Sequence, residues 1–448
     1  MKKVLLLVFC GILVLFASCT TDRNSSRPNF PAENAAGAGK VLRLVTDLGM
    51  TAEHFGFPSD TLSAQYAVDQ AFELIGGLPE GCRVEVEVLP LDEADYQSRL
   101  TRLRTEIMSG QGPDIFALAT DFLDVERLFP DPNKAMLDGY FLKLDDYVER
   151  AEFMELDKMN SAVMDAGRTA EGRFVLPMRY TFGYSLFYEP VTDPKAGWWE
   201  VMNGEDRRLA QAYATTISFH EIFPEPVDYK TGTLTFSEKE LYDYFTAAFA
   251  LNPPWNGPAW TEVVEGFLQG SVPVRVPVSG DPYWNPDNKE TDTYLPARDL
   301  NGGVPATVTA YLAINKNTPY PEEAFRVADV LMSKKFQSGG KFWETGGGTS
   351  DVDKMIPVFS AADGVSVYDE LMQKTQPLNS IWYIENEMFP TYCELRDQIT
   401  CARMLSAVDQ VLDELKRHAL ETYMTMDDDL EKYVSQAYAK MVLLAGEL

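Results

Sequence analysis

Aromatic side chains in irregular, Gly- and Pro-rich parts of the sequence carry its strongest chemical signal. A flat ring in such a setting stacks on the apolar face of a pyranose, while neighbouring carboxylates and amides bind the sugar hydroxyls. Burying about 60 Å² of a sugar face on one ring contributes roughly 1.5 kcal/mol, at about 25 cal/mol per Å². A loop ring can equally cover the edge of a domain, so a cleft is favoured only where several rings meet. The candidates are Trp255, Trp260, Tyr283, Trp284, Trp343, Trp382 and Tyr383.

Motifs for catalysis and for metal or nucleotide binding are missing from the sequence. The three histidines, far apart in the chain, are His54, His220 and His418. No HExxH, Gly-x-Ser-x-Gly or Gly-x-x-x-x-Gly-Lys-Ser/Thr pattern occurs, so the signatures of zinc proteases, hydrolases and nucleotide-binding loops are absent. We expect no catalytic residue, no cofactor and no metal. Two acids, Glu385 and Glu387, keep open the alternative of a glycoside hydrolase, which needs two carboxylates about 5–10 Å apart.

The chain is strongly acidic. Its 448 residues include 39 basic and 68 acidic side chains, which give a net charge of −29. Such an excess of carboxylates repels phosphate backbones, so a nucleic-acid partner is disfavoured, and it argues mildly against anionic ligands. Hydrophobic residues make up 45% of the chain, and its length predicts two or three domains of about 150 residues each.

The N-terminus has the pattern of a signal peptide. A basic start, Met-Lys-Lys, precedes an apolar stretch over Val4–Phe16 that is too short to span a bilayer. The small residues before Cys19 resemble a bacterial lipobox, in which this cysteine becomes the lipidated first residue; an ordinary cleaved signal peptide is the alternative. We therefore predict a lipoprotein signal peptide at 1–18 and a flexible polar tether at 19–40. No later segment has an apolar run of membrane-spanning length, so we expect the soluble body to be held at the membrane by lipid alone.

The elements that would position the candidate side chains begin with alternating strands and helices. Val84, Val86 and Val88 share one face of a strand, and Leu100 and Ile107 fall on one stripe of a helix. The β-α-β-α-β order predicts a parallel sheet with helices on its faces, and ligands favour the carboxyl edge of such a sheet. The predicted ranges are strands at 41–46, 83–88 and 115–119 and helices at 63–75 and 96–107.

The α/β pattern breaks off near residue 182 and resumes near residue 307. A chain that leaves one domain and returns forms discontinuous domains, with the crossing segments side by side as a hinge and a crevice that suits a ligand. Ser237 is the expected N-cap of the helix that follows it. The predicted ranges are strands at 174–177, 184–188, 272–278 and 308–314, helices at 238–251 and 321–332, and two helices within 393–448, joined near 423–429.

Four segments, taken in their order along the chain, resemble a known family. They are Leu103–Phe116 (LRTEIMSGQGPDIF), Gly172–Pro177 (GRFVLP), Ala313–Gln337 (AINKNTPYPEEAFRVADVLMSKKFQ) and Thr422–Leu448. The first is similar to a helix-Gly-x-Gly-Pro-Asp-strand signature, and the last is similar to an acidic-capped final helix. Together they resemble the family 1 extracellular solute-binding proteins of ABC importers, a group of lipoproteins of which most look like carbohydrate binders.

The resemblance implies an α/β fold of the two-lobed, periplasmic-binding-protein-like type II class, with discontinuous lobes joined by a hinge. Three crossings are implied near Phe182, Val308 and Val358, and the lobes would close on the ligand by rotation about them. The implied lobes are residues 41–181 plus 309–357 for lobe 1 and residues 182–308 plus 358–448 for lobe 2.

Ligand-binding residues follow from the resemblance, position by position. Asp47 stands in the loop after the first strand, and Thr120 and Asp121 stand in the loop after the Pro-Asp strand. The hinge contributes Arg179 and Tyr180. Asp47 and Asp121 would accept hydrogen bonds from sugar hydroxyls, and Arg179 would donate them. The aromatic residues that complete the candidate set are Trp255, Tyr283, Trp284, Trp343 and Trp382.

The implied function is that of a lipid-anchored, extracytoplasmic substrate-binding protein. It would act as a monomer, capture a sugar or oligosaccharide between its lobes and deliver it to ABC permease subunits, with no cofactor and no bond broken. Three alternatives stay open: a surface glycoside hydrolase, a glycan-binding adhesin and a binding protein for a non-sugar polar ligand.

Overall fold

The computed structural model has two separate hydrophobic cores in the part of the chain that it describes. The described residues are 39–48, 61–89, 95–120, 126–182, 184–187, 197–205, 210, 222–251, 274–275, 293–296, 298–334, 394–422 and 428–446. Within these ranges, no helix combines the length and the apolar character needed to cross a membrane.

A six-stranded sheet runs through the first core. Its strands are β1 (Lys40–Thr46), β2 (Cys82–Val88), β3 (Ile115–Ala119), β6 (Val175–Thr181), β12 (Pro305–Ile314) and β13 (Cys401–Met404). Five of them lie in the order β2-β1-β3-β12-β13. The sixth strand, β6, lies outside this order and pairs with β12. β3 is parallel to β1 and antiparallel to β12, whereas β13 is parallel to β12. The carboxyl ends of β1 and β3 therefore point in the same direction.

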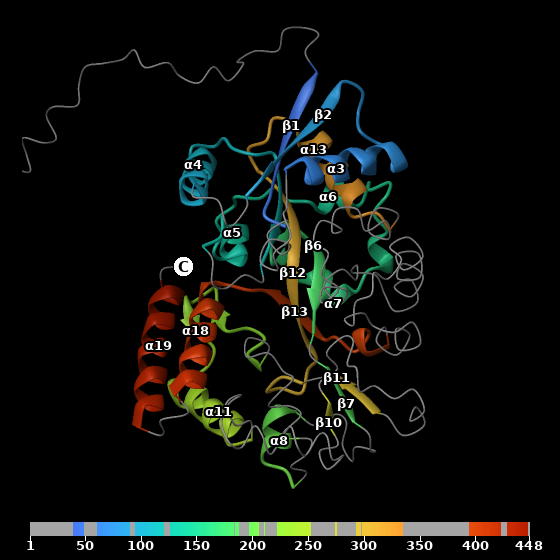
Figure 1. The fold of residues 1–448 in the computed structure, drawn as a ribbon. Coiled ribbons are helices and arrows are strands. Elements are labelled where there is room, and N and C mark those ends of the chain that lie inside the picture. The colour runs from blue at the N-terminus through green and yellow to red at the C-terminus, as the bar shows by residue number, and fades with distance from the viewer. Residues whose placement is uncertain are drawn as a thin grey trace, which may run out of the picture. The chain divides into compact units, whose positions relative to one another are not determined.

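Helices pack on this sheet through their apolar faces. They are α3 (Thr61–Ile75), α4 (Tyr96–Met108), α5 (Pro132–Leu137), α6 (Asp145–Val148), α7 (Ser161–Asp165) and α13 (Pro321–Leu331). α4 buries Leu100, Leu103 and Ile107, which belong to the stripe that the sequence predicts. α3 packs on β2, and α13 packs on both α3 and β12 (Figure 1).

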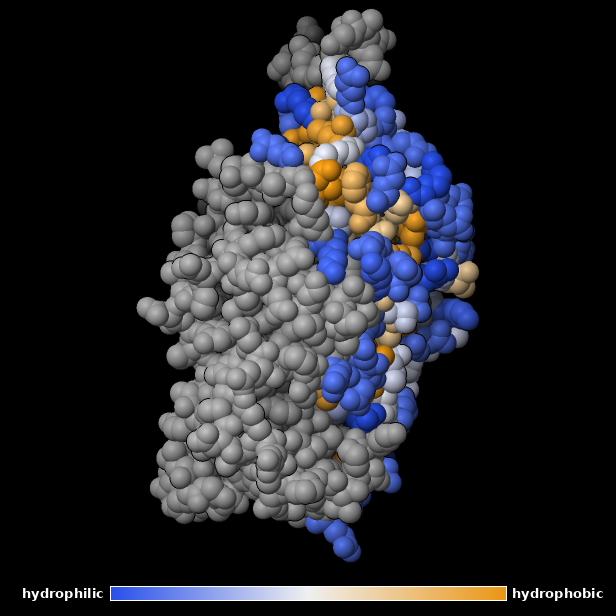
Figure 2. Space-filling view, turned by 90° about the vertical axis from the view of Figure 1, so that its right-hand side faces the viewer, coloured by the Kyte–Doolittle hydropathy of each residue, from blue (hydrophilic) through white to orange (hydrophobic). Residues whose placement is uncertain are grey.

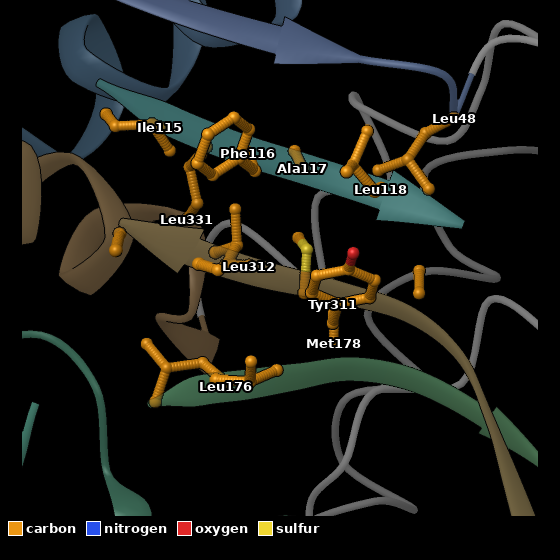
Figure 3. Close-up of a cluster of buried hydrophobic side chains, with 14 of the residues drawn as sticks. Leu48, Ile115, Phe116, Ala117, Leu118, Leu176, Met178, Tyr311, Leu312 and Leu331 are labelled. Atoms are coloured by element: carbon orange, nitrogen blue, oxygen red, sulfur yellow. The ribbon is translucent and has the colours of Figure 1, made fainter. Parts of the chain in front are cut away.

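The centre of the first core joins three neighbouring strands, β3, β12 and β6 (Figure 3). Phe116 of β3 is fully buried, and its ring centroid lies 5.1 Å from that of Phe129 and 5.9 Å from that of Phe141. Tyr311 of β12 and Met178 of β6 are buried in the same cluster. Because all ten residues of β12 are buried, a shift of register would move apolar side chains out of this packing. The packing thus fixes where each strand ends.

The second core is mainly helical. Its elements are α8 (Trp198–Met202), α11 (Glu238–Leu251), α18 (Ala407–Thr422), α19 (Asp428–Gly446), β8 (Val227–Asp228) and β9 (Thr233–Leu234). Trp198 is fully buried, with its ring centroid 4.8 Å from that of Tyr244 on α11. At the start of α11, the N–H of Ser237 donates to the carboxylate of Glu240 at 2.8 Å, and the N–H of Glu240 donates to Ser237 Oγ at 3.2 Å. This capping box confirms Ser237 as the N-cap.

Two small antiparallel sheets complete the described strands. The strands are β4 (Arg168–Thr169), β5 (Gly172–Arg173), β7 (Tyr184–Phe187), β10 (Val274–Arg275) and β11 (Thr293–Pro296). β4 pairs with β5, and β7 pairs with β10 and with β11. Because Phe187 pairs with both Val274 and Thr293, β7 is the middle strand of three. β10 is the described part of the strand predicted at 272–278.

Two of the segments that carry the family resemblance bind each other. Asp114, from the Gly-Pro-Asp segment, accepts hydrogen bonds from the N–H of Arg43 at 2.8 Å and from the hydroxyl of Thr318 at 2.6 Å. Asn315, at the end of β12, donates from its side-chain amide to the carbonyl oxygen of Pro113 at 2.9 Å. Both side chains are buried. These residues therefore hold the amino end of β3 against β1 and β12.

Most predicted elements are observed, and the strand at 115–119 and the helix at 238–251 have the predicted bounds. The two helices predicted within 393–448 are observed as α18 and α19. The sequence analysis did not predict β13, which Cys401–Met404 forms by pairing with Pro305–Val308. The break predicted after residue 177 is wrong. β6 continues to its end at Thr181 because β12 pairs with it along this whole stretch.

The chain passes from the first core to the second between Met404 and Val408. Leu395 and Met404 belong to the first core, and Val408 belongs to the second. The assignment of residues 358–448 to lobe 2 stays a prediction. The other lobe boundaries stay predictions, and the crossing expected near Val358 lies outside the described residues.

The described surface is mainly hydrophilic on the face that Figure 2 shows. Its apolar residues gather in the upper part of the view, the end at which β1, β2 and α3 lie in Figure 1. Among the described residues, the large apolar side chains that are exposed are Met108, Leu137, Val442 and Leu443.

Candidate ligand-binding site

The ends of β1 and β3 meet at one edge of the first sheet, as the sequence predicts for parallel strands. Asp47 directly follows β1, and its Oδ1 accepts a hydrogen bond of 2.7 Å from the N–H of Ala119, the last residue of β3. Thr120 follows β3. Its N–H donates to the carbonyl oxygen of Thr309 at 3.0 Å, and its side-chain hydroxyl donates to the carbonyl oxygen of Val308. Asp47 and Thr120, from distant segments, therefore lie together at the carboxyl end of β3.

A buried polar cluster surrounds this edge. Burial raises the pKa of the hydroxyls of Tyr96 and Tyr311, and the negative charge of Asp47 raises both further. The guanidinium of Arg127, which donates to the carbonyl oxygen of Thr120, shifts both pKa values in the opposite direction. One anion, one cation and two neutral hydroxyls thus lie within electrostatic range of each other. Such a group can orient hydrogen bonds at the sheet edge.

The candidate residues of the hinge lie on β6. Arg179 pairs with Ala310, and Tyr180 pairs with Val308, across a register shift that leaves Thr309 as an extra residue of β12. Successive strand residues project to opposite faces, so Arg179 and Tyr180 serve different sides of the sheet. The Tyr180 ring faces the guanidinium carbon of Arg396 at 5.8 Å from the ring centroid. A bulge of this kind bends and twists a strand, here next to the candidate site.

The four described candidates are almost entirely buried. The exposed fractions are 2% for Asp47, 0% for Thr120, 3% for Arg179 and 1% for Tyr180. Asp47 and Thr120 use their side chains to bind the backbone of neighbouring strands. In this structure they support the edge of the sheet, and their contact with a ligand stays a prediction.

The other candidates lie outside the described ranges. They are Cys19, Asp121, Trp255, Trp260, Tyr283, Trp284, Trp343, Trp382, Tyr383, Glu385 and Glu387. Within the described ranges, histidine, cysteine and acidic side chains form no group of three or more that could hold a metal ion.

Sequence reasoning missed two buried arginines beside the candidates. Arg127 is 6% exposed and Arg396 is 0% exposed. The backbone of Arg396 is held by the side-chain amide of Asn160, which donates to its carbonyl oxygen at 3.0 Å. No local pattern separates a buried arginine from a surface one. Arg127 follows Thr120 by seven residues, but this short separation does not show that its side chain is buried.

A sequence profile described as bacterial extracellular solute-binding protein matches residues 80–338, more than half of the chain. The chain belongs to this family. Its members bind solutes outside the cytoplasm, so membership implies an extracytoplasmic binding protein, and nothing points positively to catalysis. No curated protein sequence gives a significant match.

Solved structures show the same fold at low sequence identity. An extracellular solute-binding protein family 1 from Alicyclobacillus acidocaldarius is 15% identical, with a TM-score of 0.53 over 91% of this chain and 98% of that chain. A periplasmic oligogalacturonide-binding protein from Yersinia enterocolitica is 13% identical, with a TM-score of 0.54 over 91% and 99%. A cyclic alpha-maltosyl-1,6-maltose-binding protein from Arthrobacter globiformis is 13% identical, with a TM-score of 0.50 over 92% and 100%. The predicted fold class, α/β and two-lobed type II, is therefore confirmed.

Proposed function

We propose that this solute-binding protein is the lipid-anchored, extracytoplasmic receptor of an ABC importer. It captures a sugar or oligosaccharide between its two lobes, closes by hinge rotation and delivers the ligand to permease subunits, acting as a monomer. The observation that carries the proposal is the pairing of β6 with β12, which brings together two segments predicted to cross between lobes, in a chain of the solute-binding family whose described part has two separate hydrophobic cores.

The hinge part of the proposal rests on the geometry of these two strands. Thr307 pairs with Thr181, the last residue of β6, near the crossings predicted at Phe182 and Val308. Bending two adjacent strands changes the position of one core while each core keeps its own packing. A ligand that contacts both lobes then favours the closed arrangement by mass action.

The sugar part of the proposal rests on residue types and on the relatives. Two of the solved structures with this fold bind an oligogalacturonide and a cyclic maltosyl-maltose, as their names state. The loop aromatic residues of this chain supply the flat rings that such ligands need. Asp121 and Asp47 are the proposed acceptors for sugar hydroxyls, and Arg179 is the proposed donor.

The anchor part of the proposal rests on the N-terminal sequence. Cys19, after a basic start and a short apolar stretch, is the proposed site of lipidation. Mass spectrometry of the mature N-terminus tests it. A diacylated cysteine as the first residue supports the anchor, whereas an unmodified N-terminus at this position contradicts it.

Tryptophan fluorescence of the chain from Thr20 onward tests the proposed binding. Titration with mono- and oligosaccharides should give saturable quenching or a spectral shift, and chromatography should recover the sugar unchanged. Trp284→Ala and Trp255→Ala should weaken binding by about tenfold or more for each ring that stacks on the ligand. Trp198→Phe is the control, because Trp198 is fully buried in the second core. If no sugar in the panel changes the fluorescence, carbohydrate is excluded as the ligand class. If the recovered sugar is chemically altered, the protein is an enzyme.

A further inference from the structure

A hydrogen bond joins the two cores away from the paired strands of the hinge. The hydroxyl of Tyr229 donates to the carboxylate of Asp131, at 2.9 Å from Oδ2 and 3.1 Å from Oδ1. The same hydroxyl accepts from the side-chain amide of Asn133 at 3.2 Å. Tyr229 packs on the second core, in the turn between β8 and β9. Its partners belong to the start of α5, whose residues Ala135 and Met136 lie in the first core.

Asp131 has a fixed position because it also caps α5. Its Oδ1 accepts from the backbone N–H groups of Asn133 and Lys134, each at 3.0 Å. A capped helix start holds the carboxylate rigidly, so the hydroxyl of Tyr229 has one defined place to bind. Both residues are half-buried, and this burial raises the pKa of both groups.

The packing around this hydrogen bond is incomplete. An open cavity of about 340 Å³ lies beside it, lined by Asp131 and Ala135 at the start of α5, by Val408 of the second core and by Leu444, which packs against that core. A seam that contains polar contacts and a cavity of this size can separate at much lower cost than a filled apolar core. The hydrogen bond and the cavity together indicate that the two cores are in contact here but do not form one continuous core.

We propose that Tyr229 and Asp131 form a clasp, which stabilises the arrangement of the two cores seen here against any other arrangement. The clasp acts through conformation and is separate from the ligand contacts. It needs two cores that move relative to each other, as the proposed function does, but it makes no assumption about the ligand. The clasp also affects ligand affinity. A stronger clasp populates the arrangement seen here more, and a ligand that prefers a different arrangement then binds more weakly.

Single-molecule energy transfer without ligand tests the clasp. Dyes are placed at Gln97→Cys on α4 and Ser435→Cys on α19, both exposed positions, in a chain whose native cysteines are replaced by alanine. Tyr229→Phe removes the donor hydroxyl and keeps the ring. One hydrogen bond of ordinary strength predicts that Tyr229→Phe lowers the population of the parent arrangement, relative to the others, by about two- to tenfold.

Two matched variants control for the loss of a tyrosine hydroxyl. Tyr96 donates to the carbonyl oxygen of Glu126 at 2.6 Å within the first core, and Tyr438 donates to that of Phe236 at 3.1 Å within the second. Tyr96→Phe and Tyr438→Phe should lower thermal stability and leave the energy-transfer distribution unchanged. The clasp is overturned if Tyr229→Phe leaves the distribution unchanged, or if both controls shift it equally.

Asp131→Asn gives a second, independent reading. Asparagine keeps an oxygen for the cap of α5, so the fold should persist, but its bond to the hydroxyl of Tyr229 loses the charge assistance. The variant should shift the distribution in the same direction as Tyr229→Phe. The double variant should shift it no further than Tyr229→Phe alone, whereas additive shifts would mean that the two residues act separately.

Discussion

The carboxylate of Asp47 binds the N–H of Ala119 across two neighbouring strands, at 2.7 Å. Both residues are buried, and the bond joins the residue after β1 to the last residue of β3. A ligand contact was implied for Asp47, but its observed bond supports the edge of the sheet. Stability measured without ligand separates these two roles.

Replacing Asp47 with alanine should lower the free energy of unfolding by about 1–3 kcal/mol, because the buried N–H of Ala119 loses its acceptor. Asp47→Asn keeps an oxygen in place and should lose less. Urea denaturation of both variants measures the difference. Equal losses would mean that the negative charge, rather than the hydrogen bond, is what stabilises this edge.

Asn315 should be indispensable to the first sheet. Its amide donates to the carbonyl oxygens of Gln111 at 3.1 Å and Pro113 at 2.9 Å, so Asn315→Ala should cost about 2 kcal/mol or more of stability. Asn317→Ala, at an exposed position two residues later, is the matched control and should change stability by less than about 0.5 kcal/mol. Chemical denaturation decides, and similar effects at both positions would contradict the assignment.

Gly112 should tolerate no side chain. Its φ is +107°, and a Cβ there would lie 3.0 Å from Cγ1 of Ile107. Gly112→Ala should therefore destabilise the protein by about 1–3 kcal/mol. Gly446→Ala, at the exposed end of α19 with open space around it, should be neutral or slightly stabilising. Thermal unfolding of both variants is the measurement, and a neutral Gly112→Ala would be inconsistent with this backbone geometry.

Asp299 should give stability a specific pH dependence. Burial raises its pKa, although its Oδ1 accepts from the N–H groups of Asn301 at 2.8 Å and Gly303 at 2.9 Å. A raised native pKa stabilises the folded state fully below about pH 4, and this contribution is lost as the pH rises through the native value. Relative to the parent chain, Asp299→Asn should therefore become more stable as the pH rises above about 4.

Asp228 provides a control of opposite sign. The N–H of Lys230 donates to its carboxylate at 2.9 Å and holds the pKa of Asp228 below its ordinary value. The lowered pKa of Asp228 stabilises the folded protein above about pH 4, and this stabilisation is lost as the pH falls below that value. Asp228→Asn lacks the stabilisation, so its stability should be close to that of the parent at low pH and should fall below it as the pH rises toward 4. Urea denaturation across the pH range records both differences. If the difference in stability between Asp299→Asn and the parent does not change with pH, the proposed effect of burial on Asp299 is wrong.

The sequence predicted those parts of the fold whose local pattern agrees with their final environment. Ile115–Ala119 is an apolar run that is buried as a strand, and Glu238–Leu251 has an N-cap and a helical period. Cys401–Met404 has neither signal, because it becomes a strand only through its pairing with β12. Local propensity cannot report a partner that lies almost 100 residues earlier.

The candidate site follows the same division. Parallel strands place their carboxyl ends at one edge, so Asp47 and Thr120 could be brought together from the sequence alone. Arg127 and Arg396 could not, since burial of a charged side chain depends on which distant groups surround it. The bulge at Thr309 was equally invisible, because it arises from the register between β12 and β6.

The place of β12 in the sheet also sets the order in which the chain can fold. This strand ends at Ile314, yet it pairs with Ile115–Ala119, which is synthesised much earlier, and with Cys401–Met404, which is synthesised much later. Pairings between segments so far apart in sequence form slowly. The first core therefore stays incomplete until nearly the whole polypeptide is available. That delay suits a chain proposed to cross a membrane in an extended state before it folds.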